Sequence, residues 1–326
     1  MKYLNLGRSG LKVSELCLGC MSYGKGQMHS SWSLNEEESF PFFRRAIEHG
    51  INFFDTADVY AEGASEVVVG KALREFARRD EVVIATKFYP PTGPGPNQRG
   101  ASRKHIVAAV DASLKRLGVD YIDLYQQHAW DATTPLEETL WALDDLVRAG
   151  KVLYVGGSNF NAAQLRQALE LQATNRWTRF ISMQVQYNLI WREDERELIP
   201  LCEAEGVGVT AWSALARGFL AGNRTADGKG ATTRAKNDPM ASSLYFRDND
   251  FAVQATLAEV AAERGAPPMQ IALAWIASRP GLTAPIIGAT KLEQLDQAVA
   301  ATEVTLTDDE VRRLEKDYAP RLPSAG

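Results

Sequence analysis

Short apolar runs alternate with helical patterns along most of the chain, and this alternation constrains the fold more than any other feature of the sequence. In the run Val82-Val83-Ile84, apolar residues occupy successive positions, which is typical of a strand buried on both faces. Strands are expected at residues 16–19, 52–55, 82–86, 121–126, 152–155, 181–185, 207–211 and 283–287. Eight strands separated by helices predict parallel pairing and an α/β fold, the (β/α)8 TIM barrel.

Capping residues ahead of amphipathic stretches indicate where the helices begin. Asn35 precedes Glu36, Glu37 and Glu38, and acidic residues in a first turn complement the helix dipole. Gly150 occupies the position where a preceding helix would end. Helices are expected from about residue 35 and at 65–76, 102–117, 135–149, 162–170, 192–205, 251–264, 269–278, 292–301 and 308–318.

Two segments fall outside this alternation. The pattern of residues 2–15 predicts a hairpin that plugs the bottom of the barrel, with its turn at residues 7–10. Residues 215–250 are too long for an ordinary connection, so we expect either a functional lid or a partly disordered segment among the long loops at the carboxyl ends of the strands. Because no linker or change of composition interrupts the pattern, residues 1–326 are expected to form a single domain.

The composition argues against several classes of partner. Of the 326 residues, 45% are apolar, which is enough for a large core, and the net charge is −5 with basic residues scattered along the chain. Scattered basic residues argue against nucleic-acid binding and against a polybasic membrane patch. No apolar stretch reaches the roughly 18 residues that a membrane span needs, and no signal-peptide core is recognisable. The expected location is therefore cytoplasmic.

The three cysteines predict no disulfide framework. Cys17 and Cys20 form a C-x-x-C pattern, but they lie in an expected strand, whereas a redox pattern of this kind normally opens a helix. A structural zinc site needs four ligands, and no second pair is spaced to complete one. We therefore expect two buried cysteines. A metal-dependent hydrolase is also disfavoured, because no H-x-H pattern occurs among the four histidines, His29, His49, His105 and His128.

Polar side chains follow three of the expected strands. Asp55 ends the second strand and Tyr60 comes five residues later, while Lys87 follows the third strand and His128 the fourth. Because the carboxyl ends of barrel strands meet at one face, we expect these four side chains to converge there. Each alone has an ordinary explanation, such as a packed tyrosine or a salt bridge. Together, a carboxylate, a phenol, an ammonium and an imidazole can transfer a proton to a carbonyl oxygen.

Five segments resemble the aldo-keto reductase superfamily, and they occur in the order typical of that family over nearly the whole chain. They are Phe54-Asp55-Thr56-Ala57-Asp58-Val59-Tyr60, Gly63-Ala64-Ser65-Glu66, Val69-Gly70-Lys71-Ala72-Leu73, residues 120–131 and residues 150–160. Within the superfamily, the chain resembles the branch that includes the potassium-channel β subunits and their bacterial relatives.

The resemblance implies a reductase of aldehydes and ketones with a four-residue catalytic set. Tyr60 would act as the general acid that protonates the carbonyl oxygen, and the ammonium of Lys87 would lower the pKa of Tyr60 from about 10. Asp55 would pair with Lys87 and keep the buried ammonium charged. His128 would donate a hydrogen bond that orients the substrate oxygen.

The resemblance also implies an extended nicotinamide dinucleotide, although the usual dinucleotide fingerprint is missing. Gly24-Lys25-Gly26 lacks the third glycine of G-x-G-x-x-G and the helix that would follow it, so a Rossmann fold is not expected. Trp212 would stack on the nicotinamide, and Ser158, Asn159 and Gln184 would hydrogen-bond its carboxamide. The other implied contacts around the barrel mouth are Gly19, Met21, Asp55, Ser213, Leu215, Arg217, Gly218, Ile287, Gly288 and Ala289.

The end of the last expected strand bears on the choice between NADP(H) and NAD(H). Backbone amides at the start of the following helix and the charge of Lys291 suit a 2′-phosphate. However, Gln294 and Ala298 stand where many members of the family carry Arg and Asn. We therefore expect NADP(H), with NAD(H) as the alternative. The implied contacts here are Thr290, Lys291, Gln294, Gln297 and Ala298.

The substrate is expected to be a small uncharged aldehyde or ketone. Aromatic residues in segments that follow strands would form an apolar mouth with Tyr60 and His128 as its polar floor. These aromatic residues are Tyr23, Trp32, Trp130 and Trp191. The alternative function is a nicotinamide-sensing regulatory subunit whose reductase activity is slow or vestigial. Nothing in the sequence indicates an oligomer.

Overall fold

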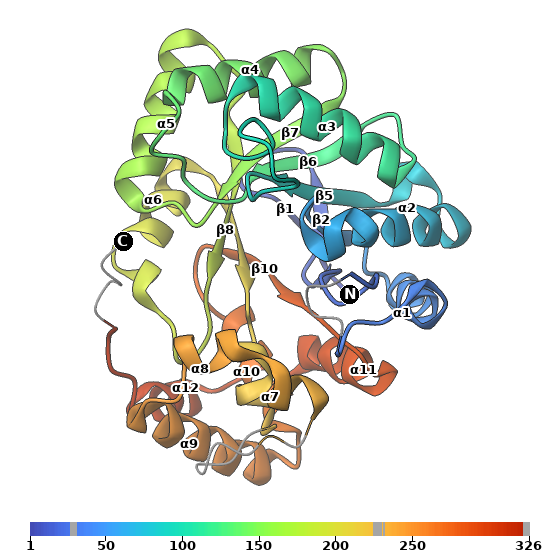
Figure 1. The fold of residues 1–326 in the computed structure, drawn as a ribbon. Coiled ribbons are helices and arrows are strands. Elements are labelled where there is room, and N and C mark those ends of the chain that lie inside the picture. The colour runs from blue at the N-terminus through green and yellow to red at the C-terminus, as the bar shows by residue number, and fades with distance from the viewer. Residues whose placement is uncertain (27–30, 224–229, 231, 322–326) are drawn as a thin grey trace.

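Eight parallel strands close into a barrel in the computed structural model, which describes residues 1–26, 31–223, 230 and 232–321 (Figure 1). Strands next to each other in the chain are paired, and β10 pairs with both β9 and β3 to complete the circle. The expected (β/α)8 TIM barrel is therefore confirmed. The strands are β3 (Cys17–Gly19), β4 (Phe53–Asp55), β5 (Val83–Phe88), β6 (Ile122–Gln127), β7 (Val152–Ser158), β8 (Phe180–Gln186), β9 (Gly208–Trp212) and β10 (Leu282–Ile287).

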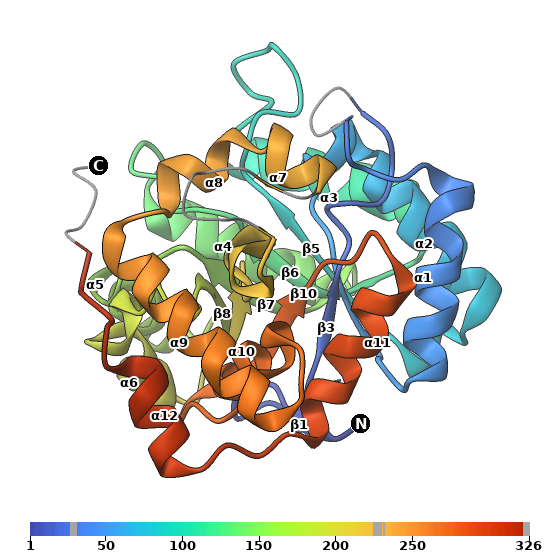
Figure 2. The same cartoon turned by 90° about the horizontal axis from the view of Figure 1, so that it is seen from below.

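Helices surround the barrel and bury its outer face (Figure 2). The longer ones are α1 (Glu36–Glu48), α2 (Ala64–Phe76), α3 (Arg103–Leu117), α4 (Leu136–Arg148), α5 (Ala162–Asn175), α6 (Leu198–Glu205), α9 (Asp248–Arg264), α10 (Pro268–Ala277), α11 (Leu292–Ala300) and α12 (Asp308–Glu315). In α1, Asn35 Oδ1 accepts a hydrogen bond from Glu38 N at 2.8 Å, and Glu38 Oε2 accepts one from Asn35 N at 2.8 Å. This reciprocal cap explains why the helix begins there. Among the described residues, no helix is both long and apolar enough to cross a membrane.

The expected hairpin plug is also present. Strands β1 (Tyr3–Asn5) and β2 (Lys12–Ser14) pair antiparallel. Leu6 and Val13 are fully buried and belong to the same hydrophobic cluster as Cys17 and Phe53, which lie at the start of two barrel strands. The plug therefore fills the amino-terminal end of the barrel and leaves the carboxyl ends of the strands for polar groups.

The expected helix at residues 192–205 is wrong in its first half. A 3-10 turn covers Glu193–Glu195, and α6 begins only at Leu198. Pro200 is compatible with this later start, because the first turn of a helix tolerates proline. Three other helix bounds differ by three residues or more: α5 continues to Asn175, α9 begins at Asp248, and α12 ends at Glu315.

The long segment between β9 and α9 contains three short helices among its described residues. It contains a 3-10 helix at Ala216–Ala221 and the short helices α7 (Thr233–Asn237) and α8 (Pro239–Leu244). Residues 224–229 and 231 lie outside the described residues. The segment is anchored by an ion pair between Arg217 Nε and Asp238 Oδ2 at 2.6 Å, in which both side chains are buried.

All three cysteines are buried and free. The expectation of two buried cysteines at positions 17 and 20 is therefore confirmed. Burial raises the pKa of both thiols well above the usual value. Neither has the exposed, electropositive surroundings that make a cysteine reactive.

Candidate active site

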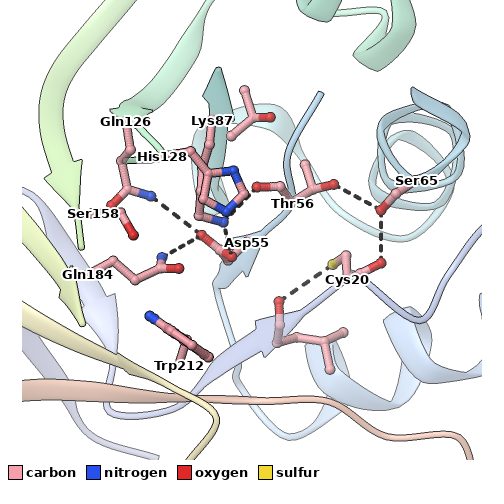
Figure 3. A network of polar contacts seen from close by, with 12 residues as sticks. Cys20, Asp55, Thr56, Ser65, Lys87, Gln126, His128, Ser158, Gln184 and Trp212 are labelled. Atoms are coloured by element: carbon pink, nitrogen blue, oxygen red, sulfur yellow. Dashed lines mark hydrogen bonds and ion pairs between the residues drawn. The ribbon is translucent and has the colours of Figure 1, made fainter. Parts of the chain in front are cut away.

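The ion pair between Asp55 and Lys87 is the centre of the polar cluster at the carboxyl ends of the strands (Figure 3). Lys87 Nζ donates to Asp55 Oδ1 at 2.5 Å and to the carbonyl oxygen of Thr56 at 2.9 Å. The side chain of Lys87 is fully buried, and that of Asp55 is 4% exposed. Burial alone would lower the pKa of Lys87, but Asp55, together with Tyr60 and Cys17, outweighs burial and raises it. The ammonium is therefore charged at neutral pH.

The second oxygen of Asp55 is also engaged. Gln184 Nε2 donates to Asp55 Oδ2 at 2.9 Å, and Gln126 Nε2 approaches the same oxygen at 3.4 Å. Figure 3 shows both amides pointing at the carboxylate. Gln126 was not among the site residues predicted from the sequence. Side chains two positions apart on a strand point to the same face. Gln126 lies two residues after Leu124 on β6, and Leu124 belongs to the inner cluster of the barrel. The alternation along β6 therefore indicates that Gln126 points inward.

Tyr60 and His128 face each other beside this pair. Their rings lie 5.9 Å apart at 81°, and Lys87 Nζ lies 5.2 Å from the centre of the Tyr60 ring. Burial raises the pKa of Tyr60, and Lys87 opposes this shift without reversing it. Lys87 does lower the pKa of Tyr60, as expected, but the larger effect of burial leaves the pKa above its usual value. The phenol stays protonated at neutral pH, as a proton donor must.

His128 is neutral in this site. Burial, and then the charge of Lys87, lower the pKa of His128 to about 3. Its Nδ1 is buried without a hydrogen-bond partner in the described part of the chain. The backbone holds the residue in place, because His128 N donates to the carbonyl oxygen of Phe88 at 2.9 Å and Asn159 Nδ2 donates to the carbonyl oxygen of His128 at 3.0 Å.

Trp212 is tied to the residues after β7. Its Nε1 donates to Asn159 Oδ1 at 2.9 Å, and Asn159 Nδ2 donates to Ser158 Oγ at 3.0 Å. The indole is partly exposed and lies near Gln184 in Figure 3. The structure thus brings together Trp212, Ser158, Asn159 and Gln184, the four residues that the sequence analysis assigned to the nicotinamide.

Strained backbone marks the same segments. Ala61 and Glu62 after β4, Asn159 after β7, and Ser213 and Arg217 after β9 all have φ between 48° and 58°. Residues other than glycine rarely adopt this left-handed region, and such strain is concentrated at functional sites. Ala216 shares this conformation. The strain supports the assignment of these segments to one site.

The other expected cofactor residues occupy two neighbouring regions. Gly19 pairs with Asp55 across β3 and β4, and Ile287 pairs with Leu18 across β10 and β3. The ends of these three strands are therefore adjacent. Met21 follows β3, residues Gly288, Ala289 and Thr290 follow β10, and residues Ser213, Leu215, Arg217 and Gly218 follow β9.

The start of α11 departs from the expectation. Gln294 Oε1 accepts hydrogen bonds from the amides of Thr290 at 3.0 Å and Lys291 at 3.2 Å. These amides were expected to face a 2′-phosphate, and the side chain of Gln294 now satisfies them. Ala298 is 1% exposed and belongs to the core, so its side chain is not the expected cofactor contact. Lys291 is exposed and Gln297 is partly exposed.

The aromatic residues expected around the substrate differ in exposure: two are buried and two are partly exposed. Tyr23 is fully buried between Phe42 and Phe43 of α1, so its assignment to an apolar mouth is wrong. The segment after β3 folds back on itself, with Gly24 N donating to the carbonyl oxygen of Leu34, and this turns Tyr23 into the core. Trp32 is 7% exposed. Trp130 packs edge-on against Phe160, and Trp191 packs edge-on against Tyr245; both are partly exposed.

No group of three or more His, Cys, Asp or Glu side chains in the described residues is placed to hold a metal ion. His128 belongs to the cluster around Lys87, and His49 Nε2 lies 2.7 Å from Asp296 Oδ1 between α1 and α11. His105 is buried on α3. His29 lies outside the described residues.

A further buried carboxyl group lies between Asp55 and Tyr60 in the chain. Asp58 is 3% exposed, and within the described residues neither of its oxygens has a hydrogen-bond partner. Burial, and then the negative charge of Glu66, raise the pKa of Asp58 to about 8. Glu66 itself is satisfied by Thr86 Oγ1 and Arg116 Nε, each at 2.6 Å. Asp58 is therefore mostly protonated at neutral pH.

Comparison with known proteins identifies the family. The profile of the aldo/keto reductase family matches residues 15–319. Versiconal hemiacetal acetate reductase of Aspergillus parasiticus is 41% identical, over 100% of this chain and 99% of its own. A proposed aryl-alcohol dehydrogenase of Schizosaccharomyces pombe is 39% identical, over 97% of this chain and 95% of its own. These relatives give no support to the narrower expectation of a branch with the potassium-channel β subunits. The chain belongs to the aldo/keto reductase family.

Proposed function

We propose that the protein reduces aldehydes or ketones to alcohols by hydride transfer from NADPH. The observation that carries the proposal is the buried ion pair of Lys87 and Asp55 beside a protonated Tyr60 and a neutral His128. A protonated phenol next to a fixed ammonium is a proton donor whose developing phenolate is stabilised as the proton leaves. Membership in the aldo/keto reductase family agrees with this chemistry.

In the proposed mechanism, Tyr60 protonates the carbonyl oxygen of the substrate. Lys87 stabilises the negative charge that develops on the phenolic oxygen, and Asp55 holds the ammonium in place. His128, as a neutral imidazole, donates one N–H to the same carbonyl oxygen and orients it. NADPH, when bound, supplies the hydride.

The residues present fit a nicotinamide ring. Within the described residues, Gln184 uses its amide nitrogen on Asp55, and its Oε1 remains available as an acceptor for a carboxamide N–H. The hydrogen bond from Trp212 Nε1 to Asn159 fixes the plane of a partly exposed indole, which suits stacking. Ser158, Asn159, Gln184 and Trp212 would therefore hold the nicotinamide.

For the substrate, we propose small aldehydes and ketones, with aromatic ones in the first panel. The name aryl-alcohol dehydrogenase carried by a relative supports aromatic carbonyl compounds. Trp130 and Trp191 offer partly exposed aromatic rings in the segments after β6 and β8. NADP(H) is proposed over NAD(H) because Lys291 is an exposed cation at the start of α11.

The test is the oxidation of NADPH with a panel of aliphatic and aromatic aldehydes and ketones, for wild type and Tyr60→Phe. We expect Tyr60→Phe to lose about 100-fold or more in kcat, the usual contribution of a positioned general acid, with NADPH binding unchanged. Tyr3→Phe is the matched control. It removes one hydroxyl group from a tyrosine that is 51% exposed on the hairpin at the other end of the barrel.

Two results would overturn the proposal. Tight NADPH binding without turnover by the wild type would favour a regulatory subunit that senses the cofactor. Failure to bind either nicotinamide cofactor would exclude both functions.

A further inference from the structure

Arg321, far from the barrel strands in sequence, is buried and joins three separate segments. Its Nε donates to the carbonyl oxygen of Ile190 at 2.8 Å, and its two terminal nitrogens donate to the carbonyl oxygen of Leu244 at 2.6 Å and to Asp250 Oδ1 at 2.5 Å. The side chain is 3% exposed, and that of Asp250 is fully buried. The guanidinium therefore fastens the end of α8 and the start of α9 to the segment that follows β8.

Asp250 receives a second anchor on its other oxygen. Arg247 N donates to Asp250 Oδ2 at 3.0 Å and caps the start of α9. A buried guanidinium is costly unless it is paired and its donors are satisfied, and Arg321 meets both conditions. Its loss would leave Asp250 buried without its partner. Arg321 therefore restricts the positions of the end of α8 and the start of α9.

The guanidinium of Arg321 also lies beside two aromatic rings. It is 5.2 Å from the ring centre of Trp191 and 5.7 Å from that of Tyr245. These two rings meet edge to face, 6.5 Å apart at 88°. The position of Tyr245 therefore depends on Arg321, both through its ring and through its chain neighbour Leu244.

Tyr245 also contacts the segment after β9, which belongs to the proposed cofactor site. Its hydroxyl accepts hydrogen bonds from Gln186 Nε2 at 2.7 Å and Asn188 Nδ2 at 3.2 Å, and it donates to Ser213 Oγ at 3.1 Å. Asn188 Nδ2 also donates to the carbonyl oxygen of Ser213 at 3.0 Å. Ser213 has the left-handed conformation, φ 58°, and directly follows Trp212. Packed contacts thus connect Arg321 to the proposed nicotinamide-stacking residue.

We propose that Arg321 is a positioning residue for cofactor retention: it holds Tyr245 against Ser213 and so keeps Trp212 and the segment after β9 in the binding conformation. This inference rests on the proposed function, because it takes Trp212 as a contact of the nicotinamide. Arg321 does not touch the reacting atoms. Its loss accelerates release of the cofactor and leaves the hydride-transfer step unchanged.

The test compares Arg321→Met, Tyr245→Phe and the double variant with wild type. The release rate of NADPH is measured by stopped-flow tryptophan fluorescence, and hydride transfer is measured in single turnovers at saturating NADPH. For Arg321→Met we expect release about 10-fold faster and a KM for NADPH raised to match, with the single-turnover rate within about two-fold of wild type. Because both residues act through one chain of contacts, the double variant is expected to release NADPH no faster than Arg321→Met.

Arg264→Met is the control for a general loosening of α9. Arg264 pairs with Glu310 near the other end of the same helix, and its side chain is 33% exposed. We expect this variant to release NADPH at the wild-type rate. Tyr245→Phe removes the hydroxyl that bonds to Gln186, Asn188 and Ser213, and we expect it to release NADPH faster than wild type. Should Arg321→Met fail to fold, Arg321→Lys replaces it, because lysine keeps the charge but loses the forked donors.

The outcomes separate this inference from the proposed function. Wild type that binds and oxidises NADPH, with Tyr245→Phe and Arg321→Met both releasing it at the wild-type rate, would overturn the role of Arg321 and leave the reductase intact. The same holds if Arg264→Met accelerates release as much as Arg321→Met. Wild type that binds no nicotinamide cofactor would overturn both.

Discussion

Gln184 Nε2 lies 2.9 Å from Asp55 Oδ2, and this hydrogen bond crosses the interior of the barrel. Gln184 is on β8 and Asp55 is on β4, which are opposite strands in the order around the barrel. Because Lys87 holds the other carboxylate oxygen, Asp55 has no freedom to rotate. The carboxylate therefore fixes the ammonium beside Tyr60 and, at the same time, the amide proposed to bind the cofactor.

Asp55→Asn is expected to damage both stability and catalysis. The variant keeps the volume of the side chain but leaves the buried ammonium of Lys87 without a counter-charge, which costs about 3–5 kcal/mol in the free energy of unfolding. Denaturation by urea measures this loss. We expect kcat to fall by about 100-fold as well, since an unpaired buried lysine has a lowered pKa and stabilises the phenolate less. A stability equal to wild type would contradict the dependence of Lys87 on Asp55.

Gln184→Leu separates the two roles of the network. The variant removes one donor from Asp55 and the proposed carboxamide acceptor, while the ion pair of Lys87 and Asp55 remains. We expect a rise of about 10-fold in the KM for NADPH and a smaller fall in kcat, measured by steady-state kinetics. A loss of kcat as large as that of Asp55→Asn, at unchanged KM, would contradict a cofactor contact.

The acid limb of the pH profile should not come from His128. Its pKa of about 3 keeps the imidazole neutral across the range from pH 5 to pH 8. Because this value lies below that of an unfolded histidine, the neutral form stabilises the fold above about pH 6.5, and the contribution is lost as the pH falls toward 3. NMR titration of the histidine ring protons, with His128→Gln for assignment, is expected to show no transition for His128 above pH 5.

Gln294 is expected to weaken the preference for NADPH. Its side chain occupies the amides of Thr290 and Lys291, so a 2′-phosphate that used them would have to displace it. Gln294→Ala leaves these amides open, and we expect the ratio of kcat/KM for NADPH over NADH to rise severalfold. Gln167→Ala, an exposed glutamine on α5, is the control. A ratio that stays unchanged in Gln294→Ala would separate the start of α11 from recognition of the phosphate.

Asp58 is expected to make stability decrease with rising pH. Its pKa of about 8 lies above that of an unfolded aspartate, so the folded state holds a proton that the unfolded state has lost. The stability contributed by this proton is complete below about pH 4 and is lost as the pH rises through 8, at a rate of up to about 1.4 kcal/mol per pH unit. The charged groups around the carboxyl are Glu66, Arg116 and Lys87.

Asp58→Asn replaces this carboxyl by a neutral group of the same shape. We expect the difference in unfolding free energy between pH 5 and pH 8, measured with urea, to be smaller in the variant than in wild type. Glu259→Gln, on α9 away from this cluster, serves as the control. An identical pH dependence in wild type and Asp58→Asn would show that the carboxyl of Asp58 is already ionised at neutral pH.

Sequence patterns predicted those parts of the site that follow from the periodicity of the fold. Asp55, Lys87 and His128 could be placed because parallel strands bring their carboxyl ends to one face. Tyr23 was misplaced because its direction depends on a turn that pairs with Leu34 through the backbone, which no local pattern indicates. Arg321 could not be predicted at all, since its partner Ile190 lies 131 positions earlier in the chain. Local signals therefore located the polar cluster at the strand ends but not the contacts that hold the segments around it.

The bond across the barrel also predicts an order of events in folding. Lys87 and Asp55 are 32 positions apart and lie on neighbouring strands, so their ion pair can form in a half-built sheet. Gln184 and Asp55 are 129 positions apart, and contacts at such separations form late because a long loop must first be closed. A half-built sheet that lacked β8 would therefore contain the charged pair without its third partner. The proposed hydride transfer would therefore require the closed barrel.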